Sequence, residues 1–187
     1  MSELLLVRLG EDPEAEAVRL RDLYSNDGVD SSVFAEFETT VHAYKSISIP
    51  DIAERIRAKY CGDNPGAYGA IPVWGGVDAG MVVWGIKDYL RSQTGKEGVV
   101  EVRGVNVSGW ALRQYRNQGL GGKVLHLAAQ QANDLIHGHD GEWGGRTLWT
   151  GIDKKNTASR KIAEAAGFRE VCAEQDKPER LIYEFVE

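Results

Sequence analysis

The sequence predicts one mixed α/β domain, in which a mostly antiparallel, twisted sheet is flanked by about four helices. Strand-like and helix-like patterns alternate along the whole chain, and neither an internal repeat nor a linker divides it. The 187 residues are enough to bury one core, so we expect a single domain over 1–187.

Short strands and two helices are predicted in the first half of the chain. Pro50 and Asp51 begin one of these helices, because proline is favoured in the first turn of a helix. The glycine-rich residues 75–80 form the turn of a hairpin. The elements expected here are strand 4–9, helix 13–25, helix 50–60 and hairpin 67–87.

The second half alternates strands with two further helices. β-branched residues alternate between Val99 and Val107, which predicts a strand. Gly167 ends the last helix, since glycine readily adopts the left-handed conformation that closes a helix. The elements expected here are loop 91–98, strand 99–111, helix 119–136, strand 147–152, helix 156–166 and strands 169–175 and 180–186.

Composition limits the classes of partner and compartment. The formal net charge of −6 argues against a general nucleic-acid binder and is compatible with a cationic acceptor such as an amine. Cys61 and Cys172 are isolated and lack metal-ligand spacing, so we expect free thiols. The apolar run Leu4–Val7 is too short for a signal peptide, and no stretch is long enough to span a membrane. We therefore expect a cytoplasmic protein without a membrane partner.

The most informative stretch is the turn of residues 116–122, which opens a predicted helix. A glycine-rich turn at a helix start directs unpaired backbone N–H groups at one point, and the helix dipole makes that point attractive to anions. Gly119 and Gly121 carry no side chain that would block a phosphate. The turn predicts a phosphate-bearing ligand held by main chain; the alternative is an ordinary glycine-softened helix start.

Two common nucleotide-binding loops do not fit this turn. A Walker loop needs Ser or Thr where the chain has Val124. A dinucleotide fingerprint needs a third glycine where the chain has Leu125. A nucleotide-binding domain is therefore the weaker hypothesis. The pattern that remains is R-x-x-G-x-G after a strand, formed by Arg116, Gly119 and Gly121.

A second motif follows the strand predicted at 147–152. It reads N-x-A-S-x-x-I-A-x-x-x-G-F from Asn156 to Phe168. Together the two motifs resemble the Gcn5-related N-acetyltransferase (GNAT) superfamily, and this form of the second motif is similar to the branch that acetylates the N-termini of ribosomal proteins. The resemblance covers nearly the whole chain in element order, while its specific motifs are confined to 116–168.

The resemblance implies a GNAT-like fold with acetyl-CoA as the cofactor. In the family, the turn binds the pyrophosphate, and main chain of the preceding strand pairs with the pantetheine arm and bonds the acetyl oxygen. Asn156 matches the asparagine that contacts this arm, and Lys123 either adds charge or belongs to a solvated face. The residues expected to bind the cofactor are Trp110, Ala111, Leu112, Arg116, Asn117, Gln118, Gly119, Leu120, Gly121, Gly122, Lys123, Asn156 and Ser159.

Two positions used for catalysis in many relatives are replaced in this chain. Ala163 stands where many members keep a proton-donating Tyr. In the ribosomal-protein branch a Ser at the position of Ser159 is the proposed donor; the alternative is a hydroxyl bonded to its own helix. Val105 stands where histone-type relatives keep a catalytic Glu. Glu101 lies four residues earlier, on the same strand face if no bulge intervenes, and is either the base or a paired or solvated carboxylate.

The missing base favours an acceptor that is easy to deprotonate. At pH 7 an α-amine costs roughly 1.4 kcal/mol to deprotonate, and a lysine amine about 4.6 kcal/mol. We therefore expect an N-acetyltransferase acting on a primary amine, first of all a protein or peptide N-terminus. The alternatives are a small amine (an amino acid, a polyamine or an aminoglycoside) and a non-catalytic CoA-binding domain. The resemblance also leaves a homodimer open.

Two segments have an open function. Residues 26–49 correspond to the region that helps form the acceptor pocket in relatives, or they are a loop that covers the core with its aromatic side chains. Residues 137–145 contain His137, His139 and two acidic residues, which could bind a metal. A glycine-rich connector is the favoured interpretation of this second segment, so no metal is expected.

Overall fold

The computed structural model describes residues 3–25, 48–61, 67–92, 99–115, 117–138, 143–175 and 177–186. The chain divides into two compact units. The first unit combines Met1–Val83 with Gly109–Gly121, and the second combines Trp84–Ser108 with Gly122–Glu187.

The main sheet consists of β1 (Leu4–Arg8), β2 (Ala67–Trp74), β3 (Val77–Asp78), β4 (Gly80–Ile86), β7 (Gly104–Ala111), β8 (Thr147–Asp153), β9 (Phe168–Ala173) and β10 (Arg180–Phe185). Its hydrogen-bonded order is β1-β2-β4-β7-β8-β10-β9, with β3 paired to β2. β7 and β8 are parallel, whereas β1–β2, β2–β3, β8–β10 and β9–β10 are antiparallel. The prediction of a mixed, mostly antiparallel sheet is confirmed.

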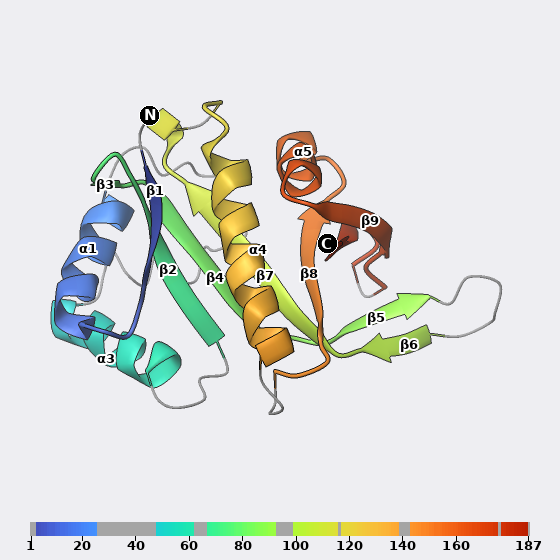
Figure 1. Cartoon of the computed structure of the whole chain (residues 1–187), viewed down its shortest axis with the longest axis horizontal. Coiled ribbons are helices and arrows are strands. Elements are labelled where there is room, and N and C mark those ends of the chain that lie inside the picture. Colours follow the sequence, from blue (N-terminus) through green and yellow to red (C-terminus); the bar gives the residue numbers. More distant parts are fainter. Residues whose placement is uncertain are drawn as a thin grey trace. The chain divides into compact units, whose positions relative to one another are not determined.

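In the first unit, helices α1 (Pro13–Ser25) and α3 (Ile49–Tyr60) lie beside β1 and β2 (Figure 1). Leu20 of α1 and Ile56 of α3 are fully buried in one cluster with Ile71 of β2. Burying an aliphatic side chain of this size contributes about 1.5–3 kcal/mol. This shared apolar cluster holds the two helices on the strands.

Side-chain caps determine where these helices begin. The buried carboxylate of Glu16 accepts three backbone N–H groups of the turn before α1, from Gly10, Glu11 and Asp12 at 2.7, 3.1 and 3.0 Å. Ser48 caps α3 by accepting a backbone N–H of its first turn, which also contains proline. Satisfied donors at a helix start stabilise it by about 1 kcal/mol. Both helices begin within one residue of the predicted positions.

The turn between β2 and β3 depends on two glycines. Gly75 and Gly76 have φ values of 60° and 83°. Two successive left-handed residues form a type I′ turn, whose twist matches that of the flanking strands. The predicted hairpin and its turn are confirmed.

The second unit contains α5 (Thr157–Ala165) and most of α4 (Leu120–Gly138), which begins in the first unit. Gly167 follows α5 with a φ of 98°, as predicted for a left-handed helix end. Tyr89, Trp149 and Ile182 form a small buried cluster, in which the two aromatic rings lie 4.9 Å apart.

The strand predicted over 99–111 is two strands. β6 (Val99–Val102) pairs with β5 (Tyr89–Ser92) in a separate two-stranded sheet, the β5–β6 ribbon, and the chain enters the main sheet only at Gly104. A Cβ on Gly104 would lie 2.5 Å from Nε1 of Trp149. The strand breaks at Arg103, directly before this close approach, and no local pattern indicates the break. The predicted loop 91–98 likewise starts inside β5, and its residues 93–98 lie outside the described residues.

Three smaller observations concern the other expectations. A short 3₁₀ helix, η1 (Arg113–Tyr115), follows β7 and was not predicted. Cys61 and Cys172 are free thiols, as expected. Among the described helices, none combines the length and the apolar character needed to cross a membrane.

Candidate active site

The turn that opens α4 requires residues that tolerate a left-handed backbone. Asn117 and Gly119 have φ values of 61° and 72°, a region that Asn and Gly adopt most readily. A Cβ added at Gly119 would meet no atom of the described residues within 4 Å. Gln118 ties the turn to η1, because its Nε2 donates to the carbonyl oxygen of Gln114 at 2.8 Å. Open space therefore lies beside this main chain, and the predicted Arg116 lies outside the described residues.

The first turn of α4 supplies backbone donors. Leu120 is 1% exposed and anchors the helix start in the core. The first N–H groups of a helix have no partner within it, and the helix dipole adds a partial positive charge. Gly121 and Gly122 add no side chain here, and Lys123 is exposed. A phosphate-bearing cofactor fits this cradle of main-chain N–H groups.

Within the second unit, Gly122 and His126 of α4 lie against the end of α5. A Cβ on Gly122 would lie 3.8 Å from Cβ of Ala165, and Nδ1 of His126 lies 3.1 Å from the carbonyl oxygen of Ala166. α5 has 9 residues, so its two ends are about 13 Å apart at a rise of about 1.5 Å per residue. Within this unit, the first turn of α5 is thus about one helix length from the contact of Gly122 with Ala165.

Asn156 and Ser159 lie together in the first turn of α5. The side-chain oxygen of Asn156 accepts the backbone N–H of Ser159 at 3.1 Å and caps the helix. Ser159 is half-buried, and among the described residues its hydroxyl has no hydrogen bond. The alternative of a hydroxyl bonded to its own helix is therefore not seen. Ala163, where many relatives keep Tyr, is fully buried.

An ionic network that the sequence did not predict holds α5 on β9 and β10. Nε of Arg160 donates to the Tyr183 hydroxyl at 2.9 Å, and its Nη2 lies 3.3 Å from Glu170. The hydrogen bond to Tyr183 raises the pKa of Arg160, and burial raises the pKa of Tyr183. Arg160 follows Ser159 directly, but its partners lie 23 and 10 residues further along the chain. No local motif could therefore have identified the network.

The end of β7, in the first unit, approaches β4 closely. A Cβ on Gly109 would lie 2.8 Å from the carbonyl oxygen of Met81, and a Cβ on Gly80 would overlap main chain of Trp110. The Trp110 side chain is 8% exposed, and its ring lies 5.5 Å from that of Tyr24. Its Nε1 has no hydrogen-bond partner among the described residues.

The backbone groups of Leu112, directly after the end of β7, already have hydrogen-bond partners. The Leu112 N–H donates to the carbonyl oxygen of Ala79 at 2.8 Å, and the Leu112 carbonyl accepts the N–H of Tyr115 at 3.0 Å. Both backbone groups of Leu112 are thus already bonded within the first unit. Ala111 is half-buried and is the last residue of the strand.

The structure does not bring Glu101 to the strand face of Val105. Glu101 is exposed on β6 and faces Leu90 of β5 in the ribbon. Val105 is fully buried on β7, in the other sheet. The premise that put both residues on one strand is wrong, because the chain changes sheets at Arg103. Glu101 as the base stays a prediction without support from this geometry.

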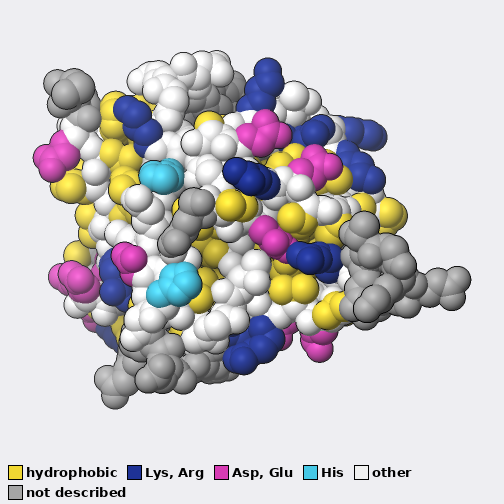
Figure 2. Space-filling model, turned by 45° about the vertical axis from the view of Figure 1, so that its right-hand side comes forward, with side chains coloured by type: hydrophobic (Ala, Val, Ile, Leu, Met, Phe, Trp, Pro, Cys, Tyr) yellow, Lys and Arg dark blue, Asp and Glu magenta, His cyan; other side chains and the backbone are white. Residues whose placement is uncertain are grey.

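Charges of both signs are mixed on the surface. Figure 2 shows Lys and Arg side chains interspersed with Asp and Glu side chains on one face of the molecule. Among the described residues, no group of three or more His, Cys, Asp and Glu side chains could hold a metal ion. Residues 26–47 of the candidate acceptor segment 26–49 and residues 139–142 of the histidine-containing segment lie outside the described residues.

Comparison with known proteins gives a family match and several fold matches. The sequence model described as "Acetyltransferase (GNAT) domain" matches residues 18–169. No curated protein matches the chain. The solved structure of RimL, a ribosomal L7/L12 alpha-N-protein acetyltransferase in complex with coenzyme A, has a TM-score of 0.59 at 12% identity, covering 98% of this chain and 93% of RimL.

Two other solved structures of similar fold bear the names of different acetyltransferases. The microcin C7 self-immunity acetyltransferase MccE, in complex with acetyl-CoA and AMP, has a TM-score of 0.63 at 16% identity, covering 99% of this chain and 93% of MccE. A chimera of the spermidine N-acetyltransferase SpeG from Vibrio cholerae and hSSAT has a TM-score of 0.60 at 12% identity, covering 98% and 94%. At such identities the likeness extends to the fold alone.

Proposed function

The chain belongs to the GNAT acetyltransferase family, whose members are acyltransferases that use acetyl-CoA, and we propose that it acetylates the α-amine of a protein or peptide N-terminus. The whole chain, 1–187, would act as one domain. The observation that carries the cofactor assignment is the turn before α4, where Gly119 has a φ of 72° and open space beside its backbone.

The cofactor would be held mainly by backbone groups. The N–H groups from Gly119 to Lys123 would bind the pyrophosphate, since they are at a helix start and glycine leaves them accessible. Asn117 and Gln118 would shape this turn. Asn156 would contact the pantetheine arm through the side-chain amide that its helix cap leaves available. Trp110 and Ala111 would contribute main chain, and Leu112 would contribute packing.

Proton transfer would use few groups. Bound acetyl-CoA supplies an activated thioester, whose thiol leaving group has a reference pKa near 8.5. Because such a thiol leaves readily as thiolate, proton donation by the Ser159 hydroxyl would be useful rather than essential, at the low end of the ~10²–10⁴-fold range of acid–base catalysis. The hydroxyl of Ser159 has no other hydrogen bond among the described residues, which supports this role.

The proposed acceptor follows from the residues that this chain has where relatives keep a general base. Val105 is buried and apolar where histone-type relatives keep Glu, and Glu101 lies in the ribbon. Water would then accept the proton of the amine. An α-amine loses its proton at roughly 1.4 kcal/mol at pH 7, against about 4.6 kcal/mol for lysine, so the site would favour the α-amine.

A polyamine or another small cationic amine is the second candidate acceptor. The net charge of −6 favours it, because an acidic protein attracts a polycation. A third candidate, a non-catalytic CoA-binding domain, is favoured by the replacement of the usual Tyr and Glu with Ala163 and Val105.

Calorimetric titration with acetyl-CoA, beside NAD and ATP, tests the cofactor. Binding of acetyl-CoA alone at micromolar concentration supports the proposal, and its absence overturns it. Thiol release is then measured with peptides, amino acids, polyamines and aminoglycosides. Turnover with peptides is expected; robust lysine acetylation without α-amine activity contradicts the acceptor assignment, and binding without any turnover favours the non-catalytic domain.

We further assign a cytoplasmic location and leave open a homodimer. The isolated thiols of Cys61 and Cys172 support a reducing compartment. Sedimentation of the purified protein measures the oligomeric state, and fractionation of cells measures the location.

A further inference from the structure

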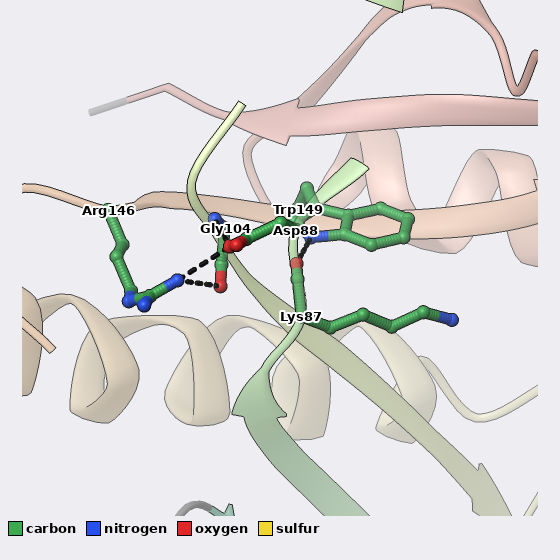
Figure 3. A network of polar contacts seen from close by, with 5 residues as sticks. All are labelled: Lys87, Asp88, Gly104, Arg146 and Trp149. Atoms are coloured by element: carbon green, nitrogen blue, oxygen red, sulfur yellow. Dashed lines mark hydrogen bonds and ion pairs between the residues drawn. The ribbon is translucent and has the colours of Figure 1, made fainter. Parts of the chain in front are cut away.

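A polar cluster joins three separate segments at the base of the β5–β6 ribbon (Figure 3). The segments are Lys87–Asp88 before β5, Gly104 at the start of β7, and Arg146 with Trp149 at the start of β8. All of these residues belong to the second unit. We call the contacts of Asp88, Gly104 and Arg146 the clasp.

The ion pair of the clasp is short and its cation is buried. Nη1 of Arg146 lies 2.6 Å from Oδ1 of Asp88, and the Arg146 side chain is 7% exposed. The same Oδ1 accepts the backbone N–H of Gly104 at 2.8 Å, and Arg146 Nη1 also lies 3.3 Å from the Gly104 carbonyl oxygen. One carboxylate oxygen thus links the strand that enters the sheet to the segment that precedes β8. A buried cation needs such a partner, because its desolvation is costly when unpaired.

Glycine at position 104 lets the backbone reach this position. A Cβ there would lie 2.5 Å from Nε1 of Trp149 and 2.6 Å from the carbonyl oxygen of Lys87. These two atoms bond each other, since the indole N–H donates to that carbonyl at 2.7 Å. The N–H of Lys87 also donates to the carbonyl oxygen of Gly104 at 2.9 Å. The start of β7 is therefore held from both sides.

The clasp lies at the first of three pairs between β7 and β8. Their parallel register runs from Gly104 opposite Thr147 to Asn106 opposite Trp149. On its other edge β8 pairs with β10 from Trp149 to Asp153, while β7 continues past Asn106 to Ala111. Only three residue pairs join β7 and β8. A shift of the first pair would therefore change which main-chain groups of β7 have a partner in β8.

We propose that Asp88 and Arg146 are positioning residues for the cofactor: by fixing where β7 and β8 begin to pair, they determine which backbone groups of β7 beyond Asn106 stay available to the pantetheine arm. This inference rests on the proposed function, because it assumes that an acetyl-CoA arm binds along β7. Neither side chain touches the reacting atoms. Their action is through the backbone of the strand.

The test compares Arg146→Met with Arg91→Met. Arg91 of β5 forms an ion pair with Glu184 of β10 at 2.9 Å, outside the clasp, and serves as the matched control. Affinity for CoA is measured by calorimetry and thermal unfolding by circular dichroism, both on the full chain. Arg146→Met is expected to weaken CoA binding about tenfold or more at temperatures where it is folded, as displaced binding groups do. Arg91→Met is expected to lower the melting temperature while leaving the affinity unchanged.

Two further measurements distinguish the outcomes. Arg146→Lys keeps the charge and is expected to recover most of the affinity lost in Arg146→Met. Amide hydrogen exchange of Val105 and Asn106 is expected to accelerate in Arg146→Met and not in Arg91→Met. If wild-type protein binds CoA and Arg146→Met binds it equally well, the clasp inference is overturned while the proposed function stands. If wild-type protein binds no CoA, the proposed function itself fails.

Discussion

The side-chain oxygen of Asn156 accepts the backbone N–H of Ser159 at 3.1 Å, so the cap of α5 and the proposed proton donor are joined directly. The Asn156 side chain therefore has two roles in the proposed mechanism. It satisfies a donor at the helix start and offers its amide to the cofactor. Substitutions can distinguish the two roles, because Asp retains the capping oxygen and lacks the amide N–H groups.

Replacing Asn156 tests this double role. Asn156→Ala is expected to lower the free energy of unfolding by about 1 kcal/mol through the lost cap, and to weaken acetyl-CoA binding. Asn156→Asp is expected to keep the stability and still weaken binding. Denaturant unfolding and calorimetry measure the two effects. Equal affinity in wild-type protein and Asn156→Asp would remove Asn156 from the cofactor site.

The open space at Gly119 predicts the effect of a large side chain. Gly119→Trp is expected to abolish acetyl-CoA binding by filling the phosphate cradle. Its matched control is Gly76→Trp, because Gly76 has a φ of 83° and likewise nothing within 4 Å of its Cβ. Each substitution places a side chain at left-handed φ, at a cost of about 1–2 kcal/mol. Calorimetry on the two folded variants should show binding only for Gly76→Trp; binding by both would mean that the turn is not the phosphate site.

Removing the hydroxyl of Ser159 is expected to lower turnover and leave cofactor affinity nearly intact. The loss should be no more than about 100-fold, since a thiol is a good leaving group without help. The measurement is thiol release across pH, with CoA affinity as the control. Turnover of Ser159→Ala that equals that of wild-type protein at every pH would leave Ser159 with a structural role only.

The clasp predicts a specific acid sensitivity. The hydrogen bond from the Gly104 backbone, with a smaller contribution from Arg146, lowers the pKa of Asp88 in the folded protein. Between this lowered pKa and the unfolded value near 3.9, the unfolded chain binds more protons, so stability rises with pH. The contribution of Asp88 is present above about pH 4 and is lost as pH falls through the folded pKa. Unfolding measured from about pH 3 to pH 7 should show a smaller pH dependence in Asp88→Asn; the same slope as in wild-type protein would contradict the assignment.

Two buried tryptophans differ in the partner of their indole N–H. That of Trp149 donates to the carbonyl oxygen of Lys87 at 2.7 Å, whereas that of Trp110 has no partner among the described residues. Trp149→Phe is expected to cost about 1–3 kcal/mol more than Trp110→Phe, because it leaves the Lys87 carbonyl without its donor. Denaturant unfolding of both variants measures the difference. Equal losses would show that the Trp110 N–H is bonded in solution.

The elements that the sequence predicted well are those with local signals. Helix α1 has the predicted bounds of Pro13–Ser25, Gly75 and Gly76 lie in the predicted hairpin turn, and Gly167 adopts the expected left-handed conformation. Caps and turns depend on residues next to each other in the chain, which is why one sequence is enough to find them. The turn before α4 belongs to the same class, and its family resemblance is confirmed by the match over residues 18–169.

The structure differs from the predicted site at residues whose contacts come from distant parts of the chain. Leu112 was expected to offer main chain to the cofactor, but its N–H is bonded to Ala79, 33 residues earlier in the chain. Glu101 was expected on the face of Val105, but β6 belongs to the ribbon. No local sequence pattern indicates either outcome, because each depends on which distant segment lies beside the residue in the folded protein.

The sequence by itself determined the helices, the glycine turns and the two motifs that identify the family, because each arises from backbone preferences and spacing within about one element. Only the tertiary structure decided where the strand over 99–111 breaks and where β7 and β8 begin to pair. At this place Gly104 approaches Trp149, and Asp88 contacts Arg146 across 58 residues. A contact between residues so far apart in the sequence depends on the arrangement of the strands between them. Its contribution to stability therefore belongs to the whole fold and leaves no signature in any single segment.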